Sequence, residues 1–320
     1  MASRRRPRQE RSRPDAAAGQ VALPEVPEHL VPLDWRAEHF GVLADQAHLR
    51  DAGGQLRVRE YLARMWSFRD FVRLVALGRH EARHQSTHLG RLWYLINPLL
   101  LILIYYLLFA VVLGIEERRG VDDYLPFLTV GVITYGFTRS SVQTGASALG
   151  RGAALVRSLS FPRAILPLGS VIGQGVPHLY ALVVMLAVLP VMGQAPSARW
   201  LLLPVVLVVH AVLNLGLAFF AARLTFEVPD LANLLPFVLR LGLYVSGVLV
   251  PINEALFPRD ELRGLLQANP VYSVLEMTRQ VLLDGPLDAV PWAMGVAWSA
   301  VLLTGGFAYF RRNEYRYSSG

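Results

Sequence analysis

Two histidines and a glutamate form the most specific chemical motif in the chain. His80, Glu81 and His84 match the pattern H-E-x-x-H, which on a helix places two imidazoles on one face with a carboxylate base between them. In metalloproteases such a pair binds zinc with a third ligand, for which Asp284 is the candidate. Arginines surround the motif and oppose a cation, and the topology expected below puts Asp284 across the membrane. We therefore expect a solvated helix face, no metal site and no catalytic residue.

Two residue types needed for other chemistry are missing from the sequence. Without any lysine, the chain lacks the G-x-x-x-x-G-K-[ST] loop whose lysine reaches the β- and γ-phosphates of ATP. Without any cysteine, it has no disulfides and no thiolate metal sites. No cofactor is therefore expected on this chain. If ATP drives the protein, a separate ATPase subunit must bind the ATP and Mg.

The elements that carry these residues are predicted to be membrane helices. Hydrophobic residues make up 53% of the 320 and charged residues only 17%, whereas soluble proteins have about 25% charged residues. The apolar residues form long stretches, and a spanning helix needs about 20 of them. The fold class predicted is an all-α integral membrane protein of six transmembrane helices, at residues 92–115, 124–143, 165–192, 200–224, 231–250 and 290–310.

The charge pattern predicts the orientation of these helices. The net charge is +7, and the arginines concentrate before the first span, between the second and third, and after the last. Cytosolic loops of membrane proteins carry such an excess, so nucleic acid is not needed to explain the charge. Both termini are expected in the cytosol, with the chain in the cytoplasmic (inner) membrane.

The predicted organisation has four parts. Residues 1–55 form a disordered, arginine- and proline-rich cytosolic tail, residues 56–91 a cytosolic region, residues 92–312 the six-span domain and residues 313–320 a cytosolic C-terminal tail. An amphipathic helix at 66–85 is expected to lie in the membrane interface. Asn269 and Pro270 begin a short outer helix between spans five and six, which together with its neighbours is expected to re-enter the bilayer.

The predicted spans contain arginine but no acidic residue. Arg240 lies mid-span in the fifth, where a charge usually faces a cavity or a partner. Proton-coupled carriers typically chain Asp and Glu through the membrane, so their absence disfavours that mechanism. Aromatic residues recur along the spans and suit either lipid contact, helix packing or stacking on sugar rings.

The sequence resembles a known family in several motifs. Residues 89–93 read LGRLW and residues 97–99 read NPL at the start of span one, after an arginine-rich interfacial helix. Residues 160–168 read SFPRAILPL, and Asn269-Pro270 is followed by Arg279. Over residues 66–315 this resembles the membrane permease of ABC-type polysaccharide exporters, which move O-antigen, capsule, teichoic acid or galactan. The long N-terminal tail and Pro229, where an arginine-aspartate pair is usual, depart from the pattern.

The resemblance implies a transport permease rather than an enzyme. Two copies would pair with two ATPase subunits and export a polyprenyl-diphosphate-linked glycan from the membrane lipid. The ATPase-coupling loop would include Arg151, Arg157, Ser160, Phe161, Pro162 and Arg163. Docking of the lipid diphosphate would use Arg69, Arg73, Arg79, Arg83 and Arg91. The conduit would be lined by Tyr105, Phe109, Tyr135, Phe137, Phe237, Arg240 and Tyr244, and the outer re-entrant helix would carry Asn269, Pro270, Glu276 and Arg279.

Three alternatives stay open at the level of sequence. One is a type 2 ABC permease for a drug or small lipid, with the same fold. Another is an ion-coupled secondary transporter, which the missing acidic residues disfavour. The third is a membrane enzyme, such as a glycosyltransferase or a zinc protease.

Overall fold

The computed structural model describes residues 57–73, 76, 90–114, 124–152, 161–252, 260–314 and 317. All of these belong to the unit Leu56–Gly320. The predicted tail at 1–55 and the H-E-x-x-H motif at 80–84 lie outside the described residues.

Every regular element in the described ranges is helical, which confirms the all-α prediction. In chain order, the first elements are α2 (Val58–Ser67), η2 (Gly90–Leu92), α4 (Trp93–Tyr106), η3 (Leu107–Val112), α6 (Tyr124–Ala146), α7 (Ala148–Arg151) and α9 (Ile165–Val188). They are followed by η4 (Pro190–Met192), η5 (Ala198–Leu202), α10 (Leu203–Glu227), α11 (Leu231–Val245), α12 (Asp260–Gln267), α13 (Pro270–Leu282) and α14 (Ala289–Arg312). The η3 segment is a π-helix that continues α4.

Within the described ranges, four helical segments are long and apolar enough to cross a membrane. They are Trp93–Val112, Ile165–Met192, Ala198–Glu227 and Ala289–Arg312, and they match predicted spans one, three, four and six. The two other predicted spans correspond to helices outside this group. α6 has 23 residues but is rich in Thr and Ser, and α11 has only 15. α11 ends at Val245, five residues before the predicted end, and Gly247 beyond it takes a positive φ of 68° that turns the chain.

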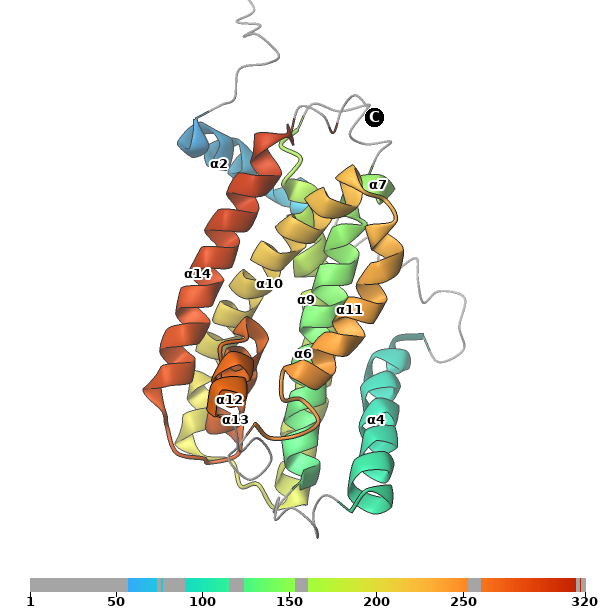
Figure 1. The fold of residues 1–320 in the computed structure, drawn as a ribbon. Coiled ribbons are helices and arrows are strands. Elements are labelled where there is room, and N and C mark those ends of the chain that lie inside the picture. The colour runs from blue at the N-terminus through green and yellow to red at the C-terminus, as the bar shows by residue number, and fades with distance from the viewer. Residues whose placement is uncertain are drawn as a thin grey trace, which may run out of the picture. The chain divides into compact units, whose positions relative to one another are not determined.

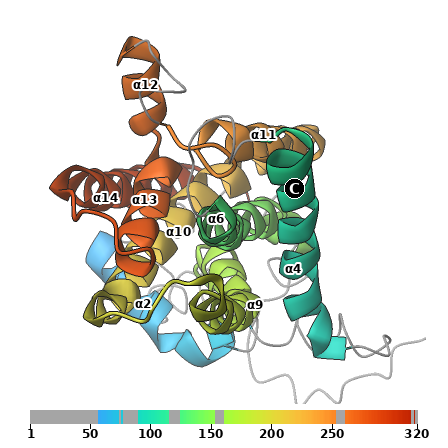
Figure 2. The same ribbon diagram turned by 90° about the horizontal axis from the view of Figure 1, so that it is seen from below.

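The central helix of the bundle is α6. It packs against α4, α9, α10, α11 and α13, and in the end-on view of Figure 2 it stands in the middle of them. Sixteen of its 23 residues are buried. A helix enclosed by protein on most sides does not need a lipid-compatible surface. Four of the polar residues that lower its hydropathy, Thr129, Thr134, Thr138 and Ser141, are buried against other parts of the protein.

Small residues let α10 and α14 approach closely. A Cβ atom on Gly306 of α14 would overlap the carbonyl oxygen of Gly216 on α10. The hydroxyl of Ser299 also donates to the carbonyl of Val209 on α10, at 3.0 Å. In a membrane, where lipid competes with apolar side chains, such close backbone contact holds helices together.

Two short helices, α12 and α13, separate α11 from α14, as the sequence predicted. α13 begins at Pro270 after the N-cap Asn269, whose side chain accepts from the N–H of Val271 at 2.9 Å. Ten of its 13 residues are buried, and it packs on α14, α6 and α10 beside the long helices, as Figure 1 shows. Re-entry of this helix into a bilayer stays a prediction.

At the N-terminal side, the helix starts earlier than the predicted 66–85. α2 already begins at Val58, and a further helical turn follows at residues 69–73. Whether this region lies in a membrane interface also stays a prediction.

Replacement of Gly306 by alanine should destabilise the protein, because the new methyl group meets the backbone of α10. Overpacking of this kind costs about 1–3 kcal/mol, which we expect as a lower midpoint of thermal unfolding in detergent. The adjacent Gly305 is the matched control, since a Cβ there lies 3.5 Å from the ring of Phe220, an ordinary contact. Gly305→Ala should leave the midpoint unchanged or raise it, because alanine favours helix by about 1 kcal/mol over glycine. Equal midpoints for the two variants would contradict this packing.

Candidate functional site

One end of the bundle gathers three distant segments of the chain. They are α2, the residues before α9, and the residues after α14. Phe161 is buried there and packs on the rings of Phe68 and Phe71, with centroids 6.5 Å and 5.4 Å away. Figure 1 shows α2 beside this end of α14. We call the group formed by Tyr61, Phe161, Arg163, Ala164 and Glu314 the junction.

A single carboxylate connects the three segments of the junction. Glu314 accepts a hydrogen bond from the hydroxyl of Tyr61 at 2.9 Å and another from the backbone N–H of Arg163 at 2.8 Å. The Tyr61 oxygen in turn accepts from the N–H of Ala164 at 3.3 Å. Hydrogen bonds to a charged acceptor are stronger than neutral ones. The start of α9 is therefore held to both ends of the described chain.

Burial keeps the junction tyrosine protonated. Burial, and next the negative charge of Glu314, raise the pKa of Tyr61. Because the shift is upward from an already basic value, the hydroxyl remains a donor at physiological pH. Arg311 also lies over the Tyr61 ring, 5.1 Å from its centroid.

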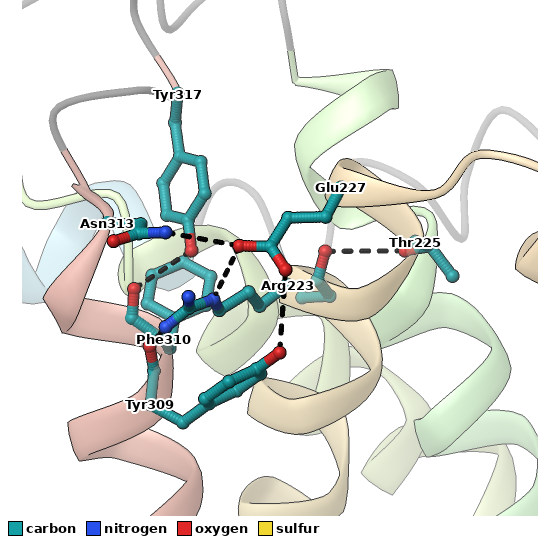
Figure 3. Close-up of polar contacts among 8 residues, drawn as sticks. Arg223, Thr225, Glu227, Tyr309, Phe310, Asn313 and Tyr317 are labelled. Atoms are coloured by element: carbon teal, nitrogen blue, oxygen red, sulfur yellow. Dashed lines mark hydrogen bonds and ion pairs between the residues drawn. The ribbon is translucent and has the colours of Figure 1, made fainter.

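A second polar network joins α10 to the C-terminal segment at the same end. Arg223 of α10 forms an ion pair with Glu227 at 2.9 Å and stacks over the ring of Tyr309 at 3.8 Å. Asn313 donates to the Glu227 carboxylate at 3.1 Å. Figure 3 shows Glu227 between Arg223, Asn313 and Tyr309, with the Tyr317 hydroxyl turned to the carbonyl of Phe310. This network holds the ends of α10 and α14 together beside the junction.

The predicted coupling loop is anchored at both of its described ends. Arg151 donates to the carbonyl oxygens of Thr144 and Ser147 at 2.9 Å and 3.3 Å, so it caps the helical turns before it. At the other end, Phe161 and the backbone of Arg163 belong to the junction, and Pro162 lies between them. Arg157 and Ser160 lie outside the described residues. These contacts tie the described ends of the loop to α6 and α9, and its coupling role stays a prediction.

The predicted diphosphate-docking arginines are only partly described. Arg69 and Arg73 are exposed, and Arg73 pairs with Asp70 at 3.5 Å. Arg79, Arg83 and the side chain of Arg91 lie outside the described residues. Within the described part of the chain, no group of three or more His, Asp or Glu side chains could hold a metal ion.

The predicted conduit residues fall into separate groups. Phe237, Arg240 and Tyr244 share an exposed face of α11. Tyr105 and Phe109 pack edge to face on the α4 segment, with ring centroids 6.4 Å apart. The remaining two are buried within the single chain: Tyr135 donates its hydroxyl to the carbonyl of Leu239 on α11, and Phe137 stacks on His178.

The outer residues predicted from the sequence form a second anchored site. Arg279 is 5% exposed and stacks over the ring of Phe127 at 3.5 Å from its centroid. Its Nη2 donates to the carbonyl oxygens of Gly247 and Val248, at 2.8 Å and 3.3 Å. Glu276 lies 3.8 Å from the Nη1 atom. The guanidinium thereby fixes α13 to α6 and to the turn that ends α11.

Asn269 adds a second tether at the start of the same helix. Besides capping α13, its amide donates to the hydroxyl of Ser246, at 3.0 Å. Sequence reasoning found Asn269 and Arg279 but missed Tyr61, Glu314 and Phe127. None of these three residues lies at a characteristic sequence distance from its partner. Tyr61 and Glu314, for example, are 253 positions apart.

Comparison with known proteins finds related sequences over most of the chain. A family model described as "ABC-2 type transporter" matches residues 75–283. An "O-antigen export system permease protein RfbA" from Myxococcus xanthus is 30% identical over 248 residues, which cover 76% of this chain and 93% of the relative. A protein of the same name from Klebsiella pneumoniae is 25% identical over 239 residues, covering 74% of this chain and 90% of the relative.

Removal of the Glu314 carboxylate should loosen α2. In Glu314→Ala, the Tyr61 hydroxyl and the Arg163 N–H lose their acceptor, which costs about 1–3 kcal/mol where the groups stay buried. We expect faster amide hydrogen exchange at residues 58–67, measured by mass spectrometry. Glu314→Gln keeps an acceptor oxygen and should change exchange less, and Asp70→Asn, on an exposed pair, should not change it. Unchanged exchange in Glu314→Ala would contradict the junction.

Replacement of Arg279 by lysine should destabilise the opposite end of the bundle. Lysine lacks the planar fork that stacks on Phe127 while donating to two carbonyl oxygens. The stack alone contributes about 2 kcal/mol where it is desolvated, so the thermal midpoint should fall by several degrees. Arg263→Lys is the control, because Arg263 pairs with an exposed carboxylate, Asp260. The assignment fails if both variants unfold at the wild-type temperature.

Proposed function

Because the chain belongs to the ABC-2 type transporter family, we propose that it is the transmembrane subunit of an ATP-driven exporter of a polyprenyl-diphosphate-linked polysaccharide. Its relatives are named as permeases, not as enzymes. Two of them are named for O-antigen export, and the chain matches each over nearly its whole length. The family is shown by the comparison, and the export of a glycan on a lipid carrier is what we propose. The same family match would suit a permease for a drug or a small lipid, and the named relatives favour a glycan.

The junction supports six membrane crossings. Tyr61 precedes α4, and Arg163 follows α6, yet both bind Glu314. Since α4 crosses once, the chain returns to the same end only if α6 crosses as well. α6 is 23 residues long, or about 35 Å at 1.5 Å per residue, enough for a hydrocarbon core of about 30 Å.

The same reasoning applies between Arg163 and Glu314. α9, α10 and α14 supply three crossings, so a fourth is required to bring Glu314 back to the junction. α11, with the turn that follows it, is the remaining apolar helix. The hydrogen bonds of Glu314 are therefore the observation that carries the topology. With the arginine-rich segments at this end, both termini lie in the cytosol and the protein lies in the cytoplasmic membrane.

The proposed machine contains two copies of this chain and two ATPase subunits. The chain has no lysine for a nucleotide loop of its own, so ATP and Mg belong to the ATPase. That subunit would dock at the junction end, beneath residues 150–163. A displacement of the coupling loop there would move α9 directly. Through the hydrogen bonds of Glu314 it would also move α2 and α14. The exposed face of α11, with Phe237, Arg240 and Tyr244, is available to line a conduit with the second copy.

The exposed arginines of the N-terminal region suit the lipid diphosphate. Arg69 and Arg73 lie next to the junction on the segment after α2. Guanidinium groups bind phosphate oxygens in pairs of parallel hydrogen bonds. In this proposal they collect the charged end of the carrier at the cytosolic surface, where the ATPase acts.

Arg163→Glu should uncouple ATP hydrolysis from export. The backbone N–H of residue 163 donates to Glu314, so the substitution adds a second carboxylate beside the first. The two negative charges repel each other. In cells that co-express the ATPase, we expect export of the surface glycan to fall by about tenfold, a loss of about 1.4 kcal/mol. The ATPase should still copurify with the chain and hydrolyse ATP.

Arg199→Glu is the matched control, because Arg199 lies before α10 at the opposite end and donates to Gly285. Its export should stay at the wild-type level. Normal export by Arg163→Glu would contradict the coupling role. Failure of any ATPase subunit to copurify with the wild-type chain, or transport by the purified chain on a proton gradient alone, would overturn the proposed function itself.

A further inference from the structure

The central helix α6 carries a polar stripe on its half nearer the junction, where Ala148 and Leu149 beyond its end pack in one cluster with Tyr61. Between residues 136 and 147, every residue that is not buried is polar except Gly136. The polar stripe consists of Arg139, Ser140, Gln143, Thr144 and Ser147. These residues recur every three or four positions and therefore share one side of the helix. A polar side left open on the central helix indicates a polar partner.

Arg139 of the polar stripe lies beside Arg240 of α11. The hydroxyl of Tyr135, one turn before Arg139, donates to the carbonyl oxygen of Leu239, the chain neighbour of Arg240. The charges of both arginines act on the hydroxyl of Tyr105 on α4, and Figures 1 and 2 show α4 and α11 on the same side of α6. Arg240 is exposed, and the guanidinium nitrogens of the half-buried Arg139 reach the protein surface. Both groups are therefore accessible to a ligand.

The three helices offer these arginines no counter-charge. The sequences of α4, α6 and α11 contain no acidic residue. Within the described part of the chain, neither Arg139 nor Arg240 forms a hydrogen bond or an ion pair. By contrast, Arg223 pairs with a carboxylate and Arg279 donates to carbonyl oxygens. Two uncompensated cations near one tyrosine repel each other, so an anion that contacts both is favoured.

The depth of the two arginines restricts the kind of anion. Arg139 lies seven residues before Ala146, the last residue of α6, or about 10 Å along the axis. Arg240 lies nine residues after Leu231, the first residue of α11, or about 14 Å. In the proposed topology both lie within a hydrocarbon core about 30 Å thick. An anion attached to a lipid chain suits this depth, because its chain stays in hydrocarbon while its head follows the polar stripe.

We propose that Arg139 and Arg240 bind the diphosphate of the lipid carrier inside the bilayer, an inference that rests on the proposed function. Guanidinium forks bind phosphate oxygens in pairs of parallel hydrogen bonds, and a diphosphate offers one phosphate to each arginine. The hydroxyl of Tyr105 supplies a further donor. The polar stripe leads to this site from the junction end. The site is separate from Arg69 and Arg73, which meet the carrier at the surface.

Glutamine substitutions separate a ligand site from a structural role. Arg139→Gln and Arg240→Gln remove charges that have no partner in the described chain. Without added lipid, both variants should therefore unfold at the wild-type temperature. Arg263→Gln is the matched control, because Arg263 lies on α12 and pairs with the exposed carboxylate of Asp260.

The test is a lipid titration of the full chain in phosphatidylcholine nanodiscs, read by native mass spectrometry. The probe is undecaprenyl diphosphate. Undecaprenol supplies the same chain without phosphate, and phosphatidylglycerol supplies an ordinary anionic headgroup. We expect wild type and Arg263→Gln to bind the diphosphate more tightly than either comparison lipid. Arg139→Gln and Arg240→Gln should each bind it about tenfold more weakly, because hydrogen bonds between charged groups are lost.

Four results would overturn the inference. Equal affinity of the wild type and both glutamine variants would place the diphosphate elsewhere. Equally tight binding of phosphatidylglycerol would mean a site for ordinary anionic lipid, and equally tight binding of undecaprenol a site for the chain alone. A lower unfolding temperature of the lipid-free variants would mean a structural role. Each leaves the proposed function intact if the chain still exports glycan with its ATPase, whereas absence of an ATPase partner would overturn that function without changing these affinities.

Discussion

The hydrogen bonds accepted by Glu314 are the constraint on which the rest of the structure depends. One carboxylate accepts from the hydroxyl of Tyr61 on α2 and from the backbone N–H of Arg163 just before α9, although these segments are far apart in the chain. Both segments therefore lie at the end of the bundle where Glu314 lies, and this contact supports the proposed paired crossings of the helices between them. In the proposed function, the same contact would connect a cytosolic ATPase to α2, α9 and α14.

The two ends of the bundle are held by different chemistry. At the junction end, carboxylates accept from tyrosine, asparagine and backbone donors, and Arg223 stacks on Tyr309. At the opposite end, Arg279 donates to carbonyl oxygens that no helix satisfies and stacks on Phe127. In both cases the charged group is tied to backbone atoms of another segment, which leaves little freedom to rearrange. Packing within the chain is light at α4, of whose 14 residues only Ile102 is buried.

The distribution of charge limits how the protein is energised. The predicted spans lack the acidic residues of a proton path, and the chain lacks the lysine of an ATP site. In the proposed function, the energy comes from a partner ATPase and enters through the predicted coupling loop.

The sequence by itself determined the helical class, the positions of the most apolar spans and the N-cap at Asn269. These follow from composition and local pattern, because a helix in lipid satisfies its own backbone and a cap acts on its nearest residues. Only the tertiary structure decided that Tyr61 meets Glu314 and that Arg163 acts through its backbone N–H. It also decided that Tyr135 and Phe137 are buried between helices and that Gly136 faces a cavity. Such contacts join residues with no fixed spacing, so the closeness of packing between helices, rather than any periodicity along the chain, specifies them.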